Sequence, residues 1–156
     1  MTVSARAKKF LDENHVKYEV RSHDKTFTAQ GLASTEHISG KEVAKVVLLK
    51  LSGGSYVMAV MPAHQLVDMD HVRKVSGESA TLADESEFQA LFPDCEIGAM
   101  SPFGNLYNIP VYADEALAKD EEIEFNAGTH TEAIRMKFAD FERLVRPKIC
   151  KLSAVT

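Results

Sequence analysis

The chain has 156 residues, with 45% hydrophobic and 26% charged side chains, a balance typical of one globular domain of ordinary size. Its two cysteines, Cys95 and Cys150, are too few for a disulfide framework and have no metal-ligand spacing, which favours a reducing compartment. No apolar run approaches the about 20 residues that cross a bilayer, and the first residues lack the apolar core of a signal peptide. The composition therefore excludes a disulfide-stapled or membrane-spanning protein and predicts a cytoplasmic one.

The net charge of −5 argues at first against a polyanionic partner. The charge is uneven, however, because residues 1–74 carry 11 Lys/Arg and 8 Asp/Glu, whereas residues 75–156 carry 7 and 15. A basic face in the first half could contact a few phosphates. The same numbers also fit a charge that simply varies along a solvated surface, so both interpretations stay open.

Hydrophobic periodicity and turn residues predict the elements of the first half. In order, these are a helix capped by Ser4 that buries Phe10 and Leu11, a half-exposed strand at Tyr18 and Val20, a short helix over 28–34, a turn at 39–40, and strands over 43–49 and 56–61. The segment 53–55, Gly-Gly-Ser, joins the last two strands, which predicts a hairpin.

The second half continues with helices and strands in no regular βαβ order. The predicted elements are helices over 68–77 and 84–92, strands at 111–113, 123–125 and 133–137, a closing helix through 141–145, and a frayed tail from Lys148. This mixture predicts a single α+β domain over 4–147, with a curved mixed β-sheet (a pseudo-barrel), flanking helices and a C-terminal tail over 148–156.

Lys45 lies inside the most apolar run of the chain, residues 43–49. Burying an unpaired ammonium group costs free energy, so a lysine in the centre of a strand needs an explanation. It could point into a cleft and hold a phosphate or carboxylate group. It could also lie on an exposed face of the strand, and the residue by itself slightly favours this simpler interpretation.

The loop from Gly98 to Asn105 contains two glycines, a serine and a proline. Such a loop permits close approach and can aim backbone N–H groups at an anion or a developing oxyanion, although ordinary connecting loops have a similar composition. Further along, Gly128-Thr129-His130 directly follows a predicted strand. Thr129 and His130 could therefore contact a substrate, but most turns of this kind are structural.

Cys95 and His130 could form a nucleophile–base pair. Glu96, next to Cys95, would raise the pKa of the thiol, and no catalytic-cysteine signature surrounds it. Ser101 does not lie in a G-x-S-x-G elbow, and the chain has neither a P-loop nor a G-x-G-x-x-G motif. Because the other histidines show no HxH or HxxxH spacing, we expect no metal and no other cofactor.

Three segments occur here in a characteristic order. They are Val43-Ala44-Lys45-Val46-Val47, the loop Gly98-Ala99-Met100-Ser101-Pro102-Phe103-Gly104, and the turn Asn126-Ala127-Gly128-Thr129-His130. Together they make the chain resemble the YbaK/EbsC family of free-standing aminoacyl-tRNA deacylases, which is related to the editing domain of bacterial prolyl-tRNA synthetases. The resemblance extends from about residue 4 to Pro147 and implies a compact α+β domain of that type.

The resemblance implies an activity and a set of site residues. Such a protein clears small amino acids, such as alanine or cysteine, from mischarged tRNA, often tRNA for proline, and an aminoacyl-tRNA synthetase is a second implied partner. Water would attack the ester at the tRNA acceptor end, and backbone N–H groups would hold the oxyanion. The expected catalytic residues are Lys45, Gly98, Ser101, Pro102 and Gly104, and the expected substrate-binding residues are Phe103, Gly128, Thr129 and His130.

Two alternatives belong to other functional classes. The first is a module that binds a tRNA end or a synthetase without hydrolysing anything. The second is a small-molecule hydrolase that uses Cys95 and His130. The identity of the amino acid is left open, because residues 92–96 read Phe-Pro-Asp-Cys-Glu where family members commonly carry a Thr-Gly pair.

Overall fold

The structure is a computed structural model that describes residues 5–22, 43–96, 99–129 and 131–154. The helices within these ranges are α1 (Ala5–Glu13), α3 (Met69–Ser76), α4 (Glu85–Leu91), α5 (Phe138–Val145) and the short 3-10 helices η1 (Gly104–Tyr107) and η2 (Leu117–Lys119). The strands are β1 (Tyr18–Ser22), β2 (Ala44–Leu51), β3 (Tyr56–Pro62), β4 (Ala80–Leu82), β5 (Val111–Asp114), β6 (Glu122–Asn126), β7 (Glu132–Lys137) and β8 (Lys148–Cys150).

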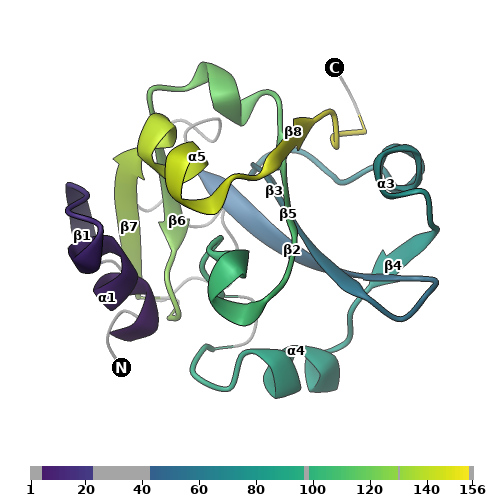
Figure 1. Cartoon of the computed structure of the whole chain (residues 1–156), viewed down its shortest axis with the longest axis horizontal. Coiled ribbons are helices and arrows are strands. Elements are labelled where there is room, and N and C mark those ends of the chain that lie inside the picture. The colour runs from purple at the N-terminus through teal and green to yellow at the C-terminus, as the bar shows by residue number, and fades with distance from the viewer. Residues whose placement is uncertain (1–4, 23–42, 97–98, 130, 155–156) are drawn as a thin grey trace.

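The strands form two sheets that meet at β2 and β6 (Figure 1). One is antiparallel, in the order β1-β7-β6, and the other is mixed, in the order β4-β2-β3-β5-β8. A parallel bridge between Val43 and Glu124 connects them, just before β2 begins. The prediction of a single α+β domain with curved mixed strands and flanking helices is confirmed.

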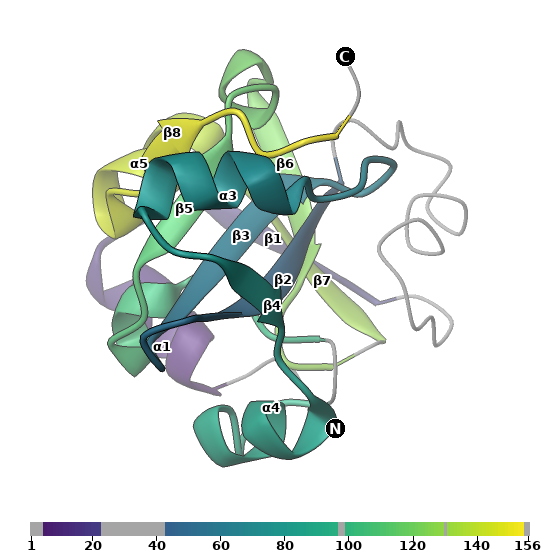
Figure 2. The same cartoon turned by 90° about the vertical axis from the view of Figure 1, so that its right-hand side faces the viewer.

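Apolar side chains pack on both faces of the five-stranded sheet. The larger cluster receives Leu11 from α1, Phe88 from α4 and Phe141 from α5. The smaller cluster lies on the opposite face, where α3 contributes Val72 (Figure 2). Since both faces of β2 and β3 are covered, these strands are apolar along most of their length. Within the described residues, no helix has the length and apolar character needed to span a bilayer.

Helices α3 and α4 begin at the residues that the sequence predicts. The Asp68 carboxylate accepts from the N–H of Asp70 at 2.8 Å and caps α3, which ends at Gly77. Asp84 and Glu87 form a reciprocal capping box at the start of α4. The predicted cap Ser4, the helix over 28–34 and the turn at 39–40 lie outside the described residues.

The C-terminal segment does not fray at Lys148 as predicted. β8 extends the mixed sheet by pairing in parallel with β5, and the Leu152 side chain is fully buried. The buried carboxylate of Asp114 accepts from the N–H groups of Leu152 and Ser153, both at 2.9 Å. This partner lies 38 residues earlier than Leu152, so local sequence signals could not show that residues 148–154 are held in place.

We predict that Asp114→Ala destabilises the fold by about 3 kcal/mol, because buried N–H groups lose a charged acceptor. Thermal or urea unfolding of the variant measures the effect. The control is Asp140→Ala, which removes a surface ion pair with Arg143 and should cost less than about 1 kcal/mol. Equal losses of stability in the two variants would contradict the anchoring role of Asp114.

Candidate active site

Lys45 does not lie on an exposed face of its strand. Its side chain is half-buried on the same face of β2 as Val43 and Leu49, both of which are fully buried, and its cross-strand neighbour is the buried Met61. Burial lowers the pKa of the Lys45 ammonium group. Within the part of the chain that the structure describes, this ammonium has no hydrogen-bond or ion-pair partner. The position therefore fits a group that meets a ligand better than a solvated surface lysine.

Asn126 lies on the same face of the molecule, at the end of β6. The parallel bridge pairs Val43 with Glu124, and Lys45 and Asn126 each follow two residues later in their strands. The Asn126 residue is 9% exposed, and its carboxamide oxygen is buried without a hydrogen-bond partner among the residues that the structure describes. A buried acceptor without a donor costs about 1–3 kcal/mol, so a ligand that supplies a donor would relieve this penalty. The sequence analysis did not select Asn126, because only tertiary contacts reveal the unpaired oxygen.

The glycine-containing loop and the turn after β6 are held together by backbone hydrogen bonds. The Gly128 N–H donates to the carbonyl of Ala99 at 2.7 Å, and the Glu96 N–H donates to the carbonyl of Gly128 at 2.8 Å. Gly128 has a φ of 102°, which an L side chain rarely adopts. Two segments selected separately in the sequence are thus adjacent. The other parts of these motifs, Gly98 and His130, lie outside the described residues.

The loop supplies unpaired backbone donors. Ala99, Met100 and Ser101 are buried. Among the described residues, the N–H groups of Met100 and Ser101 have no hydrogen-bond acceptor, whereas the Ala99 N–H donates to Glu96. Backbone N–H groups that have no acceptor among the described residues and precede the rigid Pro102 are the type of donor that an oxyanion requires.

Phe103 and Gly104 have structural surroundings that the sequence did not reveal. The Phe103 ring is fully buried against Phe10 and Phe125, with ring centroids 5.5 Å apart in both pairs. This placement does not support the expected contact of the Phe103 side chain with substrate. At Gly104, an added Cβ would lie 2.5 Å from the carbonyl oxygen of Ile109, so glycine is needed for close packing at the start of η1.

Thr129 also has a structural partner. Its side chain is 1% exposed, and its hydroxyl oxygen accepts from the N–H of Glu132 at 3.2 Å and from that of Thr131 at 3.4 Å. The hydroxyl therefore shapes the turn into β7. Because this hydroxyl is used within the turn, the expected contact of Thr129 with substrate would come from its backbone.

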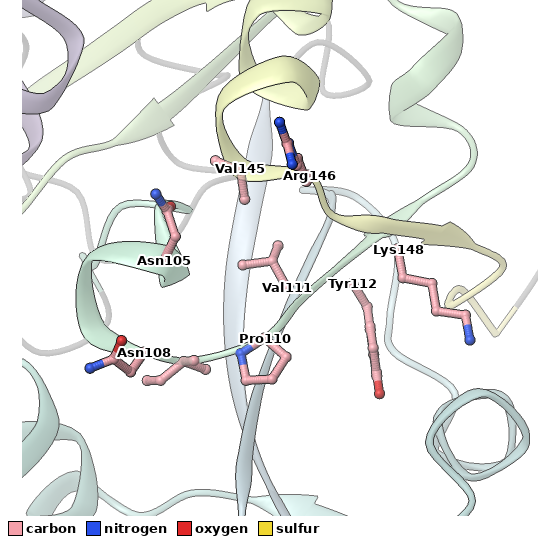
Figure 3. Close-up of a pocket in the computed structure, with 9 residues that line it drawn as sticks. Asn105, Asn108, Pro110, Val111, Tyr112, Val145, Arg146 and Lys148 are labelled. Carbon is pink, nitrogen blue, oxygen red and sulfur yellow. The ribbon is translucent and has the colours of Figure 1, made fainter. Parts of the chain in front are cut away.

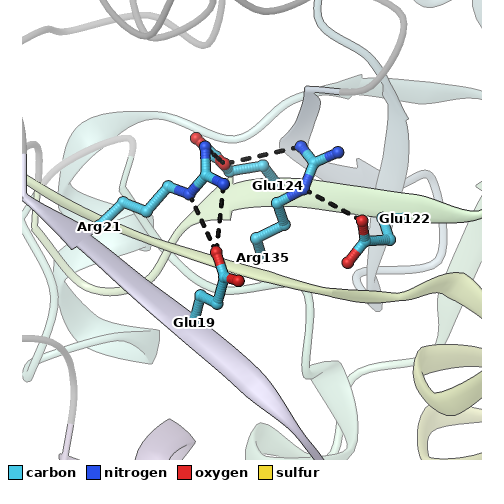
Figure 4. Close-up of polar contacts among 5 residues, drawn as sticks. All are labelled: Glu19, Arg21, Glu122, Glu124 and Arg135. Carbon is cyan, nitrogen blue, oxygen red and sulfur yellow. Dashed lines mark hydrogen bonds and ion pairs between the residues drawn. The ribbon is translucent and has the colours of Figure 1, made fainter.

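A network of charged side chains covers the outer face of β1, β7 and β6 (Figure 4). Glu124 is fully buried, and its Oε1 lies 3.5 Å from Nη1 of Arg21 and 3.8 Å from Nη1 of Arg135. Glu19 and Glu122 pair with the same two arginines at the edges of the cluster. Because Glu124 bridges directly to Val43, this network helps to fix the start of the strand that carries Lys45.

We predict that Glu124→Ala costs about 3 kcal/mol, because it removes the carboxylate between two partly buried guanidinium groups. Glu19→Ala is the matched control, since the Glu19 side chain is 68% exposed in its pair with Arg21. That control should cost less than about 1 kcal/mol in the same unfolding experiment. Stability equal to that of the unmodified protein in Glu124→Ala would contradict the role given to this network.

Cys95 is not an activated thiol. Burial, and then the neighbouring Asp94 carboxylate, raise its pKa to about 11. Its Sγ donates to Asp94 Oδ1 at 3.8 Å and lies 3.8 Å from the Tyr107 hydroxyl oxygen, which itself donates to the Asp94 carboxylate. Among the described residues, no three His, Cys, Asp or Glu side chains lie close enough together to hold a metal ion.

We predict that Cys95 reacts slowly with iodoacetamide at pH 7 and faster as the pH rises toward about 11, where its thiol ionises. Mass spectrometry after timed labelling measures the rate. Cys95→Ser should retain full ester hydrolysis. Loss of hydrolysis in Cys95→Ser, together with rapid labelling at pH 7, would restore a thiol mechanism.

Comparison with known proteins identifies the class of this protein. Residues 23–144 match the family of the aminoacyl-tRNA editing domain. The multifunctional Ser/Thr-tRNA deacylase ProXp-y of Escherichia coli (strain K12) is 26% identical over 144 residues, which cover 89% of this chain and 86% of the relative.

Solved structures show the same fold. A protein to which a trans-editing role for prolyl tRNA synthetase has been ascribed superposes with a TM-score of 0.83 at 20% identity and covers 97% of both chains. The crystal structure of the hypothetical protein APE2540 superposes with a TM-score of 0.86 at 14% identity, covering 95% of this chain and 99% of the other.

The chain belongs to the aminoacyl-tRNA editing domain family, which confirms the resemblance found in its sequence. It is an aminoacyl-tRNA deacylase, a hydrolase that acts on an ester bond, and its substrate is aminoacyl-tRNA. This assignment favours catalysis over a module that only binds tRNA.

Proposed function

We propose that this deacylase removes a small amino acid from the terminal adenosine of tRNA by direct attack of water. The observation that carries the proposal is the half-buried Lys45 ammonium, which has no partner within the described residues. An aminoacyl ester is already activated, so positioning and charge stabilisation can supply the catalysis without a covalent intermediate.

The backbone of the loop would hold the tetrahedral oxyanion. The N–H groups of Met100 and Ser101 are the proposed donors, because both lie in the loop pinned to Gly128 and neither has an acceptor among the described residues. Loss of one such donor lowers the rate by about 10²–10³ in enzymes that use an oxyanion hole. Gly98, Pro102 and Gly104 would contribute through the shape of the loop rather than through side-chain chemistry.

Two side chains would contact the substrate on the other side of the ester. The Lys45 ammonium would hold the terminal phosphate or orient the attacking water. The Asn126 carboxamide oxygen, which is buried and has no donor among the described residues, would accept from the α-ammonium group of the amino acid. His130 remains a proposed substrate contact.

The amino acids proposed to be removed are small, and the relative and the family resemblance each indicate which ones. The relative from Escherichia coli acts on Ser- and Thr-tRNA by its name, whereas the family resemblance points to alanine or cysteine, often on tRNA for proline. The structural relative's ascribed role also supports a synthetase as a second partner.

Deacylation of tRNAs charged with Ser, Thr, Ala, Cys and a bulky control such as Phe tests the proposal. Hydrolysis of Phe-tRNA alone, or of no charged tRNA, would contradict it.

We predict that Lys45→Ala lowers the single-turnover rate at least about 100-fold while the protein stays folded. Lys45→Arg provides a pH test. Burial lowers the lysine pKa, so the charged form, and with it activity, is present below that pKa and is lost as the pH rises through it. Arginine keeps its charge, so any activity retained by Lys45→Arg should extend to higher pH than that of the unmodified enzyme. Full activity in Lys45→Ala would contradict the proposed role.

A further inference from the structure

A hollow of about 440 Å³ lies outside the candidate active site, between η1, the start of β5, the end of α5 and β8 (Figure 3). None of its lining residues belongs to β2, β6 or the segment 99–102. Pro110, Val111 and Val145 form an apolar base. Polar side chains surround this base, with Asn105 and Asn108 on one side and Arg146 and Lys148 on the other, and Tyr112 lies beside Lys148.

The charge of the hollow is opposite to that of its half of the chain. Residues 75–156 carry 15 Asp/Glu and 7 Lys/Arg, yet the described residues that line the hollow include two cations and no acid. Arg146 and Lys148 are both exposed, and within residues 131–154 and the other described ranges neither has an ion-pair partner. Two unneutralised cations around one hollow create a local positive potential on an acidic protein.

The neutral side chains of the rim are also available to a ligand. Neither the Asn105 nor the Asn108 side-chain amide has a hydrogen-bond partner among the described residues. Arg146 follows α5 with a φ of 53°, a left-handed conformation at a helix end where glycine is favoured. An arginine at this position carries a conformational cost, which indicates a use for its side chain beyond ending the helix.

We propose that this hollow binds the phosphodiester backbone of the acceptor stem of the tRNA substrate. The proposal rests on the function proposed above. Guanidinium and ammonium groups pair with phosphates, and amide groups donate to phosphate oxygens or bond to ribose hydroxyls. In the sequence the hollow adjoins the loop proposed to hold the oxyanion, because η1 begins at Gly104, directly after that loop. The continuous segment 99–108 would then contact both the ester end and the stem.

The test compares the double variant Arg146→Ala/Lys148→Ala with the unmodified enzyme, using the mischarged tRNA that is hydrolysed fastest. We expect KM to rise about fivefold to tenfold with kcat unchanged, and the slope of log affinity against log salt to fall by about 2. Hydrolysis of a short aminoacylated CCA oligonucleotide, which lacks the stem, should not change. The control variant is Lys74→Ala/Lys119→Ala, which also removes two exposed cations without ion-pair partners among the described residues. It should leave the hydrolysis of both the tRNA and the oligonucleotide unchanged.

Arg146→Gly separates binding from folding. Glycine is favoured after a helix end, so this variant should melt at the same temperature or higher while its KM for tRNA still rises. Unchanged KM and salt slope in the double variant would overturn the proposal, as would an equal loss on the stem-free oligonucleotide. Binding of uncharged tRNA, followed by fluorescence anisotropy, tests the hollow even if the unmodified enzyme hydrolyses none of the charged tRNAs.

Discussion

The candidate active site depends on the backbone pairing of Gly128 with Glu96 and Ala99. This pair of hydrogen bonds joins the loop after α4 to the end of β6, although the two segments lie about 30 residues apart in sequence. It restrains Ala99 and so limits the directions in which the following N–H groups of Met100 and Ser101 can point. A rigid arrangement of this kind holds an oxyanion without reorganisation during the reaction, which is the main source of electrostatic catalysis. The positive φ of Gly128 allows the chain to reach both partners.

The polar groups of the same region are arranged at a cost to stability. Within the described residues, neither the half-buried Lys45 ammonium nor the buried Asn126 oxygen has a partner. Both lie on the face where Glu124 is buried between Arg21 and Arg135. The paired network holds the sheet, whereas the unpaired groups are left for a ligand. Aminoacyl-tRNA has the matching chemistry, since its terminal phosphate is an anion and its amino acid carries an ammonium donor.

Much of the fold could be predicted because its signals are local. The hairpin of β2 and β3, the cap at Asp68 and the capping box at Asp84 all follow from neighbouring residues. β8 and the short β4 could not be predicted, because each consists of three residues that are defined by a distant strand. The site divides in the same way. Lys45 and the two glycine segments were recognisable as motifs. The burial of Phe103, the turn-forming hydroxyl of Thr129 and the unpaired Asn126 oxygen depend on tertiary packing.

The central claim is that the loop pinned to Gly128 supplies the catalytic backbone donors, and Gly128→Ala tests it most directly. A side chain at a φ of 102° is strained, so this substitution should displace the Gly128 backbone from Ala99. The measurement is the single-turnover deacylation rate at saturating mischarged tRNA, with circular dichroism to verify folding. We predict a fall of about 100-fold with little change in tRNA affinity. An unchanged rate in the folded variant would contradict the claim.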